Sequence, residues 1–281
     1  MGQKDQGQEE LKMPVEIRQV GKNTAEKTEL QESLTDPGKS ALRKYQDLVV
    51  GLPGLWALAK YEFLTTLLGP LPGALGLVVR QKSYKFLFGR VGRGVVIGKS
   101  VTIRHGHKIR LGDNVVIEDY AVLDAKGTDN KGIVIGDNVM IGRGTVISCK
   151  NGDISIGDNT NIAMQCFIQS ARQVTIGRNN LFSAYCYLIG GGDHKTDRTD
   201  VPIIAQGQVV RGITLEDNCL LGAGAKIQDG VHIGRDAIIG TGAVVRDNVC
   251  QFGVAVGIPA KVIRRRIGEG DRTTAMSEGK K

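Results

Sequence analysis

The stretch IGDNVMIGRGTV, residues 135–146, has an aliphatic residue at its first and seventh positions and a small residue four places after each. The same period of six begins near Ile97 with IGKSVT, stops after Leu188, and resumes as LEDNCL at Leu215. A period of six matches neither the helical period of about 3.6 nor the two-residue alternation of an amphipathic strand. A fixed period sustained over this much of a chain predicts a solenoid.

We interpret each hexamer as one side of a triangular coil. The aliphatic residue points inward, the small residue fits the narrow interior, and Gly or Asp-Asn pairs tolerate the positive φ needed at each corner. Three hexamers close a coil of about 18 residues, and coils stack roughly 4.8 Å apart as parallel strands. The small interior positions include Cys166, Cys186 and Cys219, which we interpret as apolar packing residues and not as ligands.

The amino-acid composition restricts which binding partners and which cellular compartment we expect. The chain has 281 residues, a formal net charge of +8 and five cysteines, with no C-x-x-C pair. The polar start, MGQKDQGQEE, is unlike a secretory signal, so we predict a reducing, cytoplasmic location, with the inner face of a membrane as the second place to consider. The basic residues are scattered and not interleaved with aromatics, so no nucleic-acid partner is expected.

The repeat is interrupted by IGGGDHKTDRTDVPI, residues 189–203. A solenoid accommodates insertions as surface loops, and such loops commonly carry function, so we predict an extruded loop over residues 189–212. Its histidine, His194, is of the residue type best suited to take up and release a proton in acid–base catalysis near neutral pH. Asp193, Asp197 and Asp200 could orient the imidazole or hold a sugar hydroxyl. Solvated loop side chains without a role are the alternative for these carboxylates and for His194.

The hexamers from about Val95 to Ile263, together with the ending VAVGIPAKVIR, resemble the hexapeptide-repeat acyltransferases, in particular the xenobiotic, maltose and galactoside acetyltransferase group. The resemblance implies a left-handed parallel β-helix, a homotrimer and acetyl-CoA as co-substrate. It also implies that His194, in the extruded loop, is the general base.

The resemblance assigns further residues. Ala223 and Thr241 would offer main-chain contacts to the pantetheine arm, and Lys261 and Arg264 would meet the nucleotide phosphates; a solvated basic tail is the alternative for those two cations. Tyr185 stands where galactoside acetyltransferases have an asparagine near the catalytic histidine. This departure predicts a different acceptor, contacted by Tyr185.

The remaining segments have distinct compositions. Residues 1–40 are polar and are predicted to be disordered, residues 94–256 form the β-helix, and residues 257–281 form a coenzyme A-contacting segment and tail. Residues 41–93 are apolar and basic, and we expect helices that either cap the open end of the solenoid or lie in a membrane interface. In the second case, the residues facing lipid or its boundary would be Trp56, Tyr61, Phe63, Arg80, Lys82, Lys85, Arg90 and Arg93.

The sequence therefore predicts a coenzyme A-dependent O-acyltransferase that moves an acetyl group to a hydroxyl of a small-molecule or lipid-linked sugar. Two alternatives stay open. A γ-carbonic-anhydrase-like zinc protein is suggested by His105 and His107, but the histidine pair five residues apart that is typical of that class is missing, so no metal is expected. A non-catalytic β-helix scaffold would need neither the extruded loop nor the VAVGIPAKVIR ending.

Overall fold

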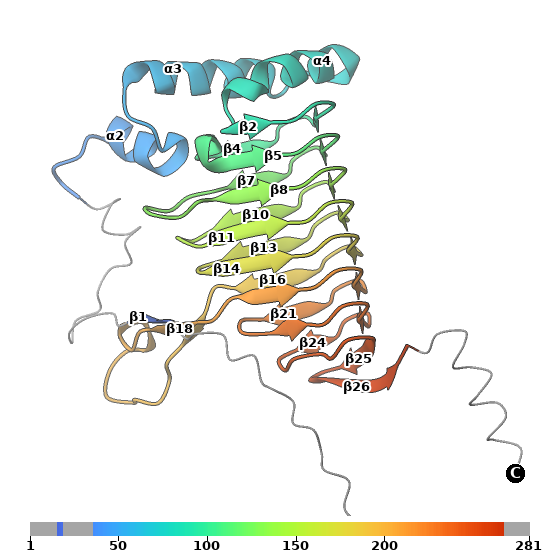
Figure 1. Cartoon of the computed structure of the whole chain (residues 1–281). Coiled ribbons are helices and arrows are strands. Elements are labelled where there is room, and N and C mark those ends of the chain that lie inside the picture. Colours follow the sequence, from blue (N-terminus) through green and yellow to red (C-terminus); the bar gives the residue numbers. More distant parts are fainter. Residues whose placement is uncertain (1–15, 19–35, 267–281) are drawn as a thin grey trace, which may run out of the picture.

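The hexamers fold into a three-faced parallel β-solenoid with helices across one end (Figure 1). The computed structural model describes residues 16–18 and 36–266. Each coil contributes one strand to each face, in the order face 1, face 2, face 3, and then the chain moves to the next coil. The predicted β-helix solenoid is confirmed, because neighbouring strands on each face pair in parallel with hexamer positions in register, apart from the antiparallel terminal pair on face 2.

The strands of the solenoid are short. Face 1 contains β2 (Arg90–Val91), β5 (Ile109–Leu111), β8 (Ile133–Ile135), β11 (Asp153–Ile156), β14 (Gln173–Ile176), β19 (Ile213–Leu215) and β22 (His232–Ile233). Face 2 contains β3 (Val96–Ile97), β6 (Val116–Ile117), β9 (Met140–Ile141), β12 (Asn161–Ile162), β15 (Leu181–Phe182), β20 (Leu220–Leu221), β23 (Ile238–Ile239), β25 (Gly253–Gly257) and β26 (Ala260–Arg265). Face 3 contains β4 (Thr102–Arg104), β7 (Val122–Asp124), β10 (Val146–Cys149), β13 (Phe167–Ser170), β16 (Tyr187–Gly190), β21 (Lys226–Gln228) and β24 (Val244–Val245).

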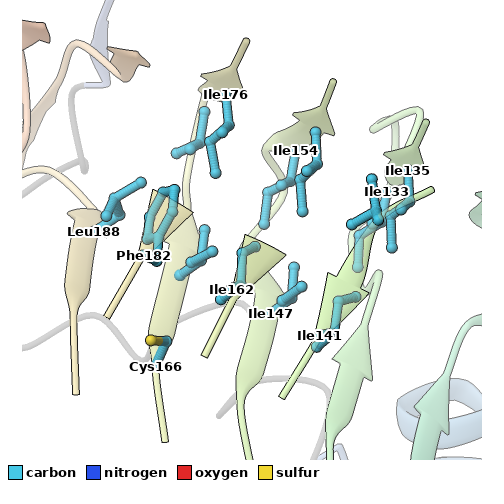
Figure 2. Packing of buried hydrophobic residues seen from close by; sticks show 14 of the residues in the cluster. Ile133, Ile135, Ile141, Ile147, Ile154, Ile162, Cys166, Ile176, Phe182 and Leu188 are labelled. Atoms are coloured by element: carbon cyan, nitrogen blue, oxygen red, sulfur yellow. The ribbon is translucent and has the colours of Figure 1, made fainter. Parts of the chain in front are cut away.

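The interior is a column of aliphatic side chains, one layer per coil (Figure 2). Ile141, Ile162 and Phe182 stack in successive layers from face 2, and all three are buried. The small residue predicted four places after each aliphatic is buried as well, and Cys166 is one of them. Cys166, Cys186 and Cys219 are free and buried, which fits their interpretation as apolar packing residues. Cys250 is also free but only half-buried.

The edge between faces 1 and 2 is built from asparagine. Asn114, Asn138 and Asn159 have φ values of 55°, 56° and 57°. Asparagine tolerates this left-handed conformation better than most side chains do. The side chains also form a ladder, since the amide of Asn114 donates to Asn138 Oδ1 and that of Asn138 donates to Asn159 Oδ1, each at 3.1 Å. The Asp-Asn pairs of the sequence thus mark this edge, as predicted.

The helices close the N-terminal end of the solenoid. They are α2 (Ala41–Tyr45), the π-helix η1 (Gln46–Val50), α3 (Leu55–Glu62), the π-helix η2 (Phe63–Leu68), α4 (Gly73–Ser83) and the 3₁₀ turn η3 (Tyr84–Phe86). A second 3₁₀ turn, η4 (Gly106–Lys108), follows β4. Figure 1 shows α3 and α4 lying across the first coil. The cap enters the hydrophobic core through Leu64 of η2 and Tyr84 of η3.

This helical cap also satisfies backbone groups of the first coil. Main-chain N–H groups of one coil donate to carbonyls of the next, so the carbonyls of the first coil lack a donor from a preceding coil. Arg80 Nε donates to the Ile97 carbonyl at 2.9 Å, and the Tyr61 hydroxyl donates to the Ile103 carbonyl at 2.8 Å. The cap therefore protects an otherwise open strand edge.

The structure corrects part of the membrane-interface expectation. Arg80 is 3% exposed and donates to three main-chain carbonyls, so it cannot face lipid. Tyr61 is half-buried and its hydroxyl is bonded to the solenoid. Trp56 and Phe63, in contrast, are largely exposed. None of the helices in the described part of the chain has the length and apolarity to cross a bilayer.

Some boundaries also differ from the sequence-based ones. The first strand of the solenoid begins at Arg90, within the segment expected to be helical. The extruded loop leaves the solenoid after Gly190, because Ile189 and Gly190 still pair with Gln169 and Ser170. The strand β1 (Glu16–Arg18) lies in the segment expected to be disordered. The rest of that expectation falls outside the described residues, apart from residues 36–40.

Candidate functional site

The extruded loop leaves at the edge between faces 3 and 1, between β16 and β19. It contains β17 (Asp193–His194), the 3₁₀ turn η5 (Ile203–Ala205) and β18 (Gln208–Val210), and β18 pairs with both β17 and β1. Gly192 starts the hairpin with φ of 82°. A Cβ at Gly192 would lie 2.7 Å from Val210 Cγ2 and 3.0 Å from the Val209 carbonyl oxygen, so this position requires glycine.

His194 stands exposed on this hairpin, directly opposite Gln208. The side-chain amide of Gln208 donates to Nε2 of His194 at 2.7 Å. This contact fixes the direction of the imidazole ring and leaves Nε2 as the acceptor nitrogen. A general base requires such an acceptor nitrogen at the surface, and in this structure its lone pair is engaged by the Gln208 amide.

Asp193 anchors the hairpin to the solenoid through a chain of charges. Its Oδ2 lies 3.2 Å from Nη1 of Arg211, and the same nitrogen lies 4.0 Å from Oδ2 of Asp229. Asp229 is buried, and it accepts from the main-chain N–H groups of Arg211 at 2.7 Å and Gly212 at 2.9 Å. Burial raises the pKa of Asp229, and those two hydrogen bonds oppose the rise. Asp193 is thus a positioning residue more than a free carboxylate.

The outer part of the loop is held by Gln206. Its side chain donates to the Arg198 carbonyl at 2.7 Å and accepts from the Arg198 N–H at 3.1 Å. Asp197 lies exposed next to this clasp. The structure does not bring Asp197 into the group formed by Asp193, His194 and their partners, so its acceptor-binding role stays a prediction.

The predicted donor residues lie along a different edge, between faces 2 and 3. Ala223 and Thr241 are exposed and sit on consecutive coils, where the N–H of Gly242 donates to the Ala223 carbonyl at 2.8 Å. Tyr185 lies one coil earlier, since the N–H of Gly224 donates to the Ala184 carbonyl at 3.0 Å. This edge thus offers accessible main chain beside small side chains, with the exposed Tyr185 one coil before Ala223.

The two predicted phosphate-binding cations lie on the terminal hairpin of β25 and β26. Lys261 is opposite Val256 and Arg264 is opposite Val254, with a register shift between them. Because opposed residues of an antiparallel pair share a face, the shift puts Lys261 and Arg264 on the same side of the hairpin. Both are exposed, and Lys261 Nζ lies 3.3 Å from Asp247 Oδ2.

The structure therefore places the predicted site residues of one chain in two separate groups. Asp193 and His194 lie at the edge between faces 3 and 1, while Tyr185, Ala223 and Thr241 lie at the edge between faces 2 and 3. Sequence reasoning missed Gln208, Arg211 and Asp229. Asp229, in IQDGVH, looks like any corner aspartate of the repeat. Gln208 and Arg211 lie in the loop, where the period gives no information on which residues meet.

The comparisons with known proteins agree with a repeat-built transferase. Residues 212–247 match the bacterial transferase hexapeptide family (six repeats), and residues 90–124 match the hexapeptide repeat of succinyl-transferase. A Saccharomyces cerevisiae protein named as a candidate acetyltransferase is 33% identical over 176 residues, which cover 59% of this chain and 86% of that protein. The chain belongs to the hexapeptide-repeat acyltransferase family.

Other relatives differ in coverage. The dTDP-4-amino-4,6-dideoxy-D-glucose acyltransferase of Escherichia coli is 32% identical over 164 residues, covering 56% of this chain and 81% of that enzyme. A candidate acetyltransferase of Mycobacterium tuberculosis is 30% identical over 132 residues, 47% of this chain, and the match spans only 44% of that longer protein. Among solved structures, the Bacillus cereus N-acyltransferase AntD, in complex with dTDP and 3-hydroxybutyryl-CoA, has a TM-score of 0.46 at 19% identity and covers 71% of this chain and 95% of that one.

One relative is a γ-carbonic anhydrase, the class of zinc enzyme that was the alternative interpretation of the sequence. The mitochondrial gamma carbonic anhydrase 1 of Arabidopsis thaliana is 34% identical over 144 residues, covering 48% of this chain and 47% of that protein. Within residues 16–18 and 36–266, however, no three His, Cys, Asp or Glu side chains gather as a metal-binding group. His105 and His107 stack at 6.0 Å between ring centroids, and His105 Nε2 lies 3.0 Å from the Asp47 carbonyl oxygen. This pair joins the cap to the first coil.

Proposed function

We propose that this protein is a coenzyme A-dependent acyltransferase that acetylates a hydroxyl of a sugar, with His194 as the general base. The observation that carries the proposal is the hairpin of β17 and β18. It presents an exposed imidazole with a defined acceptor nitrogen, outside a solenoid that otherwise has few interruptions. A non-catalytic scaffold has no use for a hairpin tied to the solenoid through Asp193, Arg211 and Asp229.

The reaction needs one proton acceptor and one acyl donor. The acceptor hydroxyl replaces Gln208 at Nε2 of His194, gives up its proton to that nitrogen, and attacks the carbonyl carbon of the thioester. The carbon–sulfur bond then breaks, and the imidazolium returns the proton to the departing thiolate. A main-chain N–H group of the donor edge would stabilise the negative charge on the carbonyl oxygen during attack.

Acetyl-CoA would lie along the edge that carries Ala223 and Thr241. The pantetheine arm is slender and bonds to main-chain groups, and the small side chains leave those groups accessible. Lys261 and Arg264, on one face of the terminal hairpin, would meet the nucleotide phosphates, because guanidinium and ammonium groups suit such anions. In this pose Asp247 would give up its contact with Lys261.

The positions of the two groups support our proposal of a homotrimer. The base and the donor edge lie at different edges of one prism, so a site that contains both is most simply completed by a neighbouring subunit. Face 2 offers a contact surface, since its outward positions are mainly apolar. They are Val96, Val116, Met140, Leu181, Leu220 and Ile238, with Asn161 as the polar exception.

The acceptor is proposed as a sugar, free, nucleotide-linked or lipid-linked. The Escherichia coli relative acts, by its name, on an amino sugar bound to dTDP, so an amine is the alternative nucleophile. Tyr185 and Asp197 are the acceptor contacts that we propose, because both are exposed and flank the two halves of the site.

A panel assay tests the function. The purified chain is incubated with acetyl-, succinyl- and 3-hydroxybutyryl-CoA against free, nucleotide-linked and lipid-linked sugars, and the products are identified by mass. We expect a mass increase of one acetyl group on a sugar hydroxyl, with release of free coenzyme A. Absence of any acylated product, with coenzyme A binding also absent by calorimetry, would show that the chain is not an acyltransferase.

A further inference from the structure

The outer side of the helical cap is apolar. In α3 and η2, the residues turned away from the solenoid are Leu55, Trp56, Phe63 and Leu67, which are 74%, 81%, 57% and 56% exposed. They recur at helical spacing, opposite the buried stripe that includes Leu58 and Leu64. In α4, Leu75 and Val78 are exposed while Gly76 and Arg80 are buried. We call the six exposed residues the cap platform: Leu55, Trp56, Phe63, Leu67, Leu75 and Val78.

The cap platform lies on the helices that cross the N-terminal end of the solenoid. Figure 1 shows α3 and α4 across the end of the prism, with the first coil beneath them. Contacts between α4 and both η2 and β3 agree with this arrangement. An exposed apolar surface made of several large side chains in one place is unusual for a soluble monomer and marks an interaction surface.

The charges around the cap platform are mainly positive. Residues 51–86 contain a single acid, Glu62, and the bases Lys60, Arg80, Lys82 and Lys85, of which Arg80 is buried. Glu62 is half-buried, and it accepts from the Tyr45 hydroxyl and from Thr66. Lys82, one turn after Val78 in α4, and Lys85, in η3, are both exposed. Within the described residues, neither has an ion pair with a carboxylate.

These observations separate three possible occupants. A second copy meeting the platform head-on would bring like charges together, because each copy presents lysines and no exposed acid. A protein partner would need an acidic, apolar surface of matching shape. A bilayer with anionic headgroups supplies negative charge and an apolar layer together, and a tryptophan beside lysines is typical of the boundary between them.

We propose that the cap platform is a docking surface for an anionic phospholipid bilayer, with Trp56 and Phe63 inserted at the headgroup boundary and Lys82 and Lys85 against the headgroup phosphates. In the trimer proposed above, cyclic symmetry puts all three caps at the same end and in one plane. Three platforms on one flat surface reinforce one another, since the second and third bind at high effective concentration. The composition of each platform does not depend on the acyltransferase proposal.

The docking geometry restricts the acceptor. From β4 to β16, where the extruded loop leaves, face 3 advances by four strand spacings, which is about 19 Å at ~4.8 Å each. The helical cap adds about 10 Å, the diameter of one helix. His194 would therefore stand about 30 Å from the headgroups, by the same spacings. A lipid-linked acceptor must then carry its target sugar at the far end of an extended glycan, while a sugar next to the lipid phosphate would be out of reach.

The native protein contains its own probe, because Trp56 is the single tryptophan of the chain. Vesicles of phosphatidylcholine and phosphatidylglycerol (3:1) are titrated into the full-length protein at low salt, with pure phosphatidylcholine vesicles in parallel. We expect the Trp56 emission to shift to shorter wavelength and to be quenched by brominated lipid, more strongly with the anionic vesicles. Sedimentation with vesicles without either change would place the contact elsewhere and overturn the proposal, as would no sedimentation at low salt.

Variants separate the two components of binding. Phe63→Ser with Leu75→Ser should weaken vesicle binding at least tenfold, whereas Val134→Ser, an exposed apolar residue on face 1, should not change it. Lys82→Gln with Lys85→Gln should remove the salt-sensitive part of binding. Lys131→Gln with Lys150→Gln, the same change in net charge on the exposed side of the solenoid, should leave it intact.

Two further outcomes are decisive. If light scattering shows an assembly larger than a trimer that Phe63→Ser with Leu75→Ser converts to trimers, the platform binds a second copy and the membrane proposal is wrong. Acyl transfer to a water-soluble sugar should be the same in this variant and in the wild type. A loss of vesicle binding with unchanged transfer therefore concerns the platform alone. Failure of the membrane proposal can thus be told apart from failure of the proposed acyltransferase function.

Discussion

Replacing Arg80 with methionine should weaken the fold by about 3 kcal/mol. The guanidinium is buried and donates to the carbonyls of Leu71 at 2.6 Å, Ile97 at 2.9 Å and Gly69 at 3.3 Å. A hydrogen bond from a charged donor contributes about 1.5–3 kcal/mol, so the two short bonds account for roughly 3–6 kcal/mol. Removing a buried cation relieves its desolvation, and methionine keeps the packing of the stem, which brings the net loss toward the lower value.

The assay is equilibrium unfolding in urea, with thermal melting as a second readout. A loss of about 3 kcal/mol corresponds to a drop in Tm of roughly 6–12 °C for a domain of this size. Lys82→Met is the matched control, because Lys82 is exposed on the same helix, and it should change stability by less than about 0.5 kcal/mol. If Arg80→Met is as stable as Lys82→Met, the guanidinium does not satisfy the carbonyls of the first coil, and our account of the cap is wrong.

Three further outcomes are expected. Burial lowers the pKa of both His105 and His107 below the ordinary 6.5, so the folded protein binds fewer protons than the unfolded chain once the pH falls below about that value. Stability should then fall with decreasing pH, by up to about 1.4 kcal/mol per pH unit for buried His105 and by less for half-buried His107, which water partly screens. The His105→Gln with His107→Gln variant should show a flatter pH profile in thermal melts. Gly192→Ala should lower acyl transfer while leaving the Tm nearly unchanged, since it strains only the hairpin. Gly191→Ala is the control and should remain active, because its Cβ would meet the flexible end of a glutamine. Equal activity of the two variants would contradict the hairpin geometry. Ile147→Ala, in the fully buried column, should cost about 2–5 kcal/mol in urea unfolding, and a loss below 1 kcal/mol would contradict the tight interior.

The repeat predicted the solenoid because the hexamer is a local rule: each aliphatic, each small residue and each Asp-Asn corner is determined within six residues. The role of Arg80 could not be predicted in the same way. In the sequence it is one of several bases after an apolar run, and only the packing of α4 on β3 shows that it donates to the Ile97 carbonyl. Composition therefore suggested a lipid-facing arginine where the structure has a buried one.

The residues of the candidate site also differ in whether the sequence could predict them. His194 could be singled out because it lies where the period fails, and failure of a period is visible in sequence. Gln208 and Asp229 could not, because their contacts depend on how the loop folds back on itself and on the solenoid. Ala223 and Thr241 were predicted through family resemblance, and the structure adds that they lie on consecutive coils at an edge away from His194.

The central claim, that His194 is the base of an acyl transfer, is tested most directly by measuring turnover and coenzyme A affinity together in His194→Ala. His232→Ala is the matched control, since His232 also lies at the surface, where its Nε2 is 2.9 Å from Glu216 Oε1. We predict that His194→Ala lowers kcat by roughly 10²–10⁴-fold while the Kd for coenzyme A by calorimetry changes by less than about twofold, and that His232→Ala matches the wild type. Wild-type turnover in His194→Ala would contradict the claim.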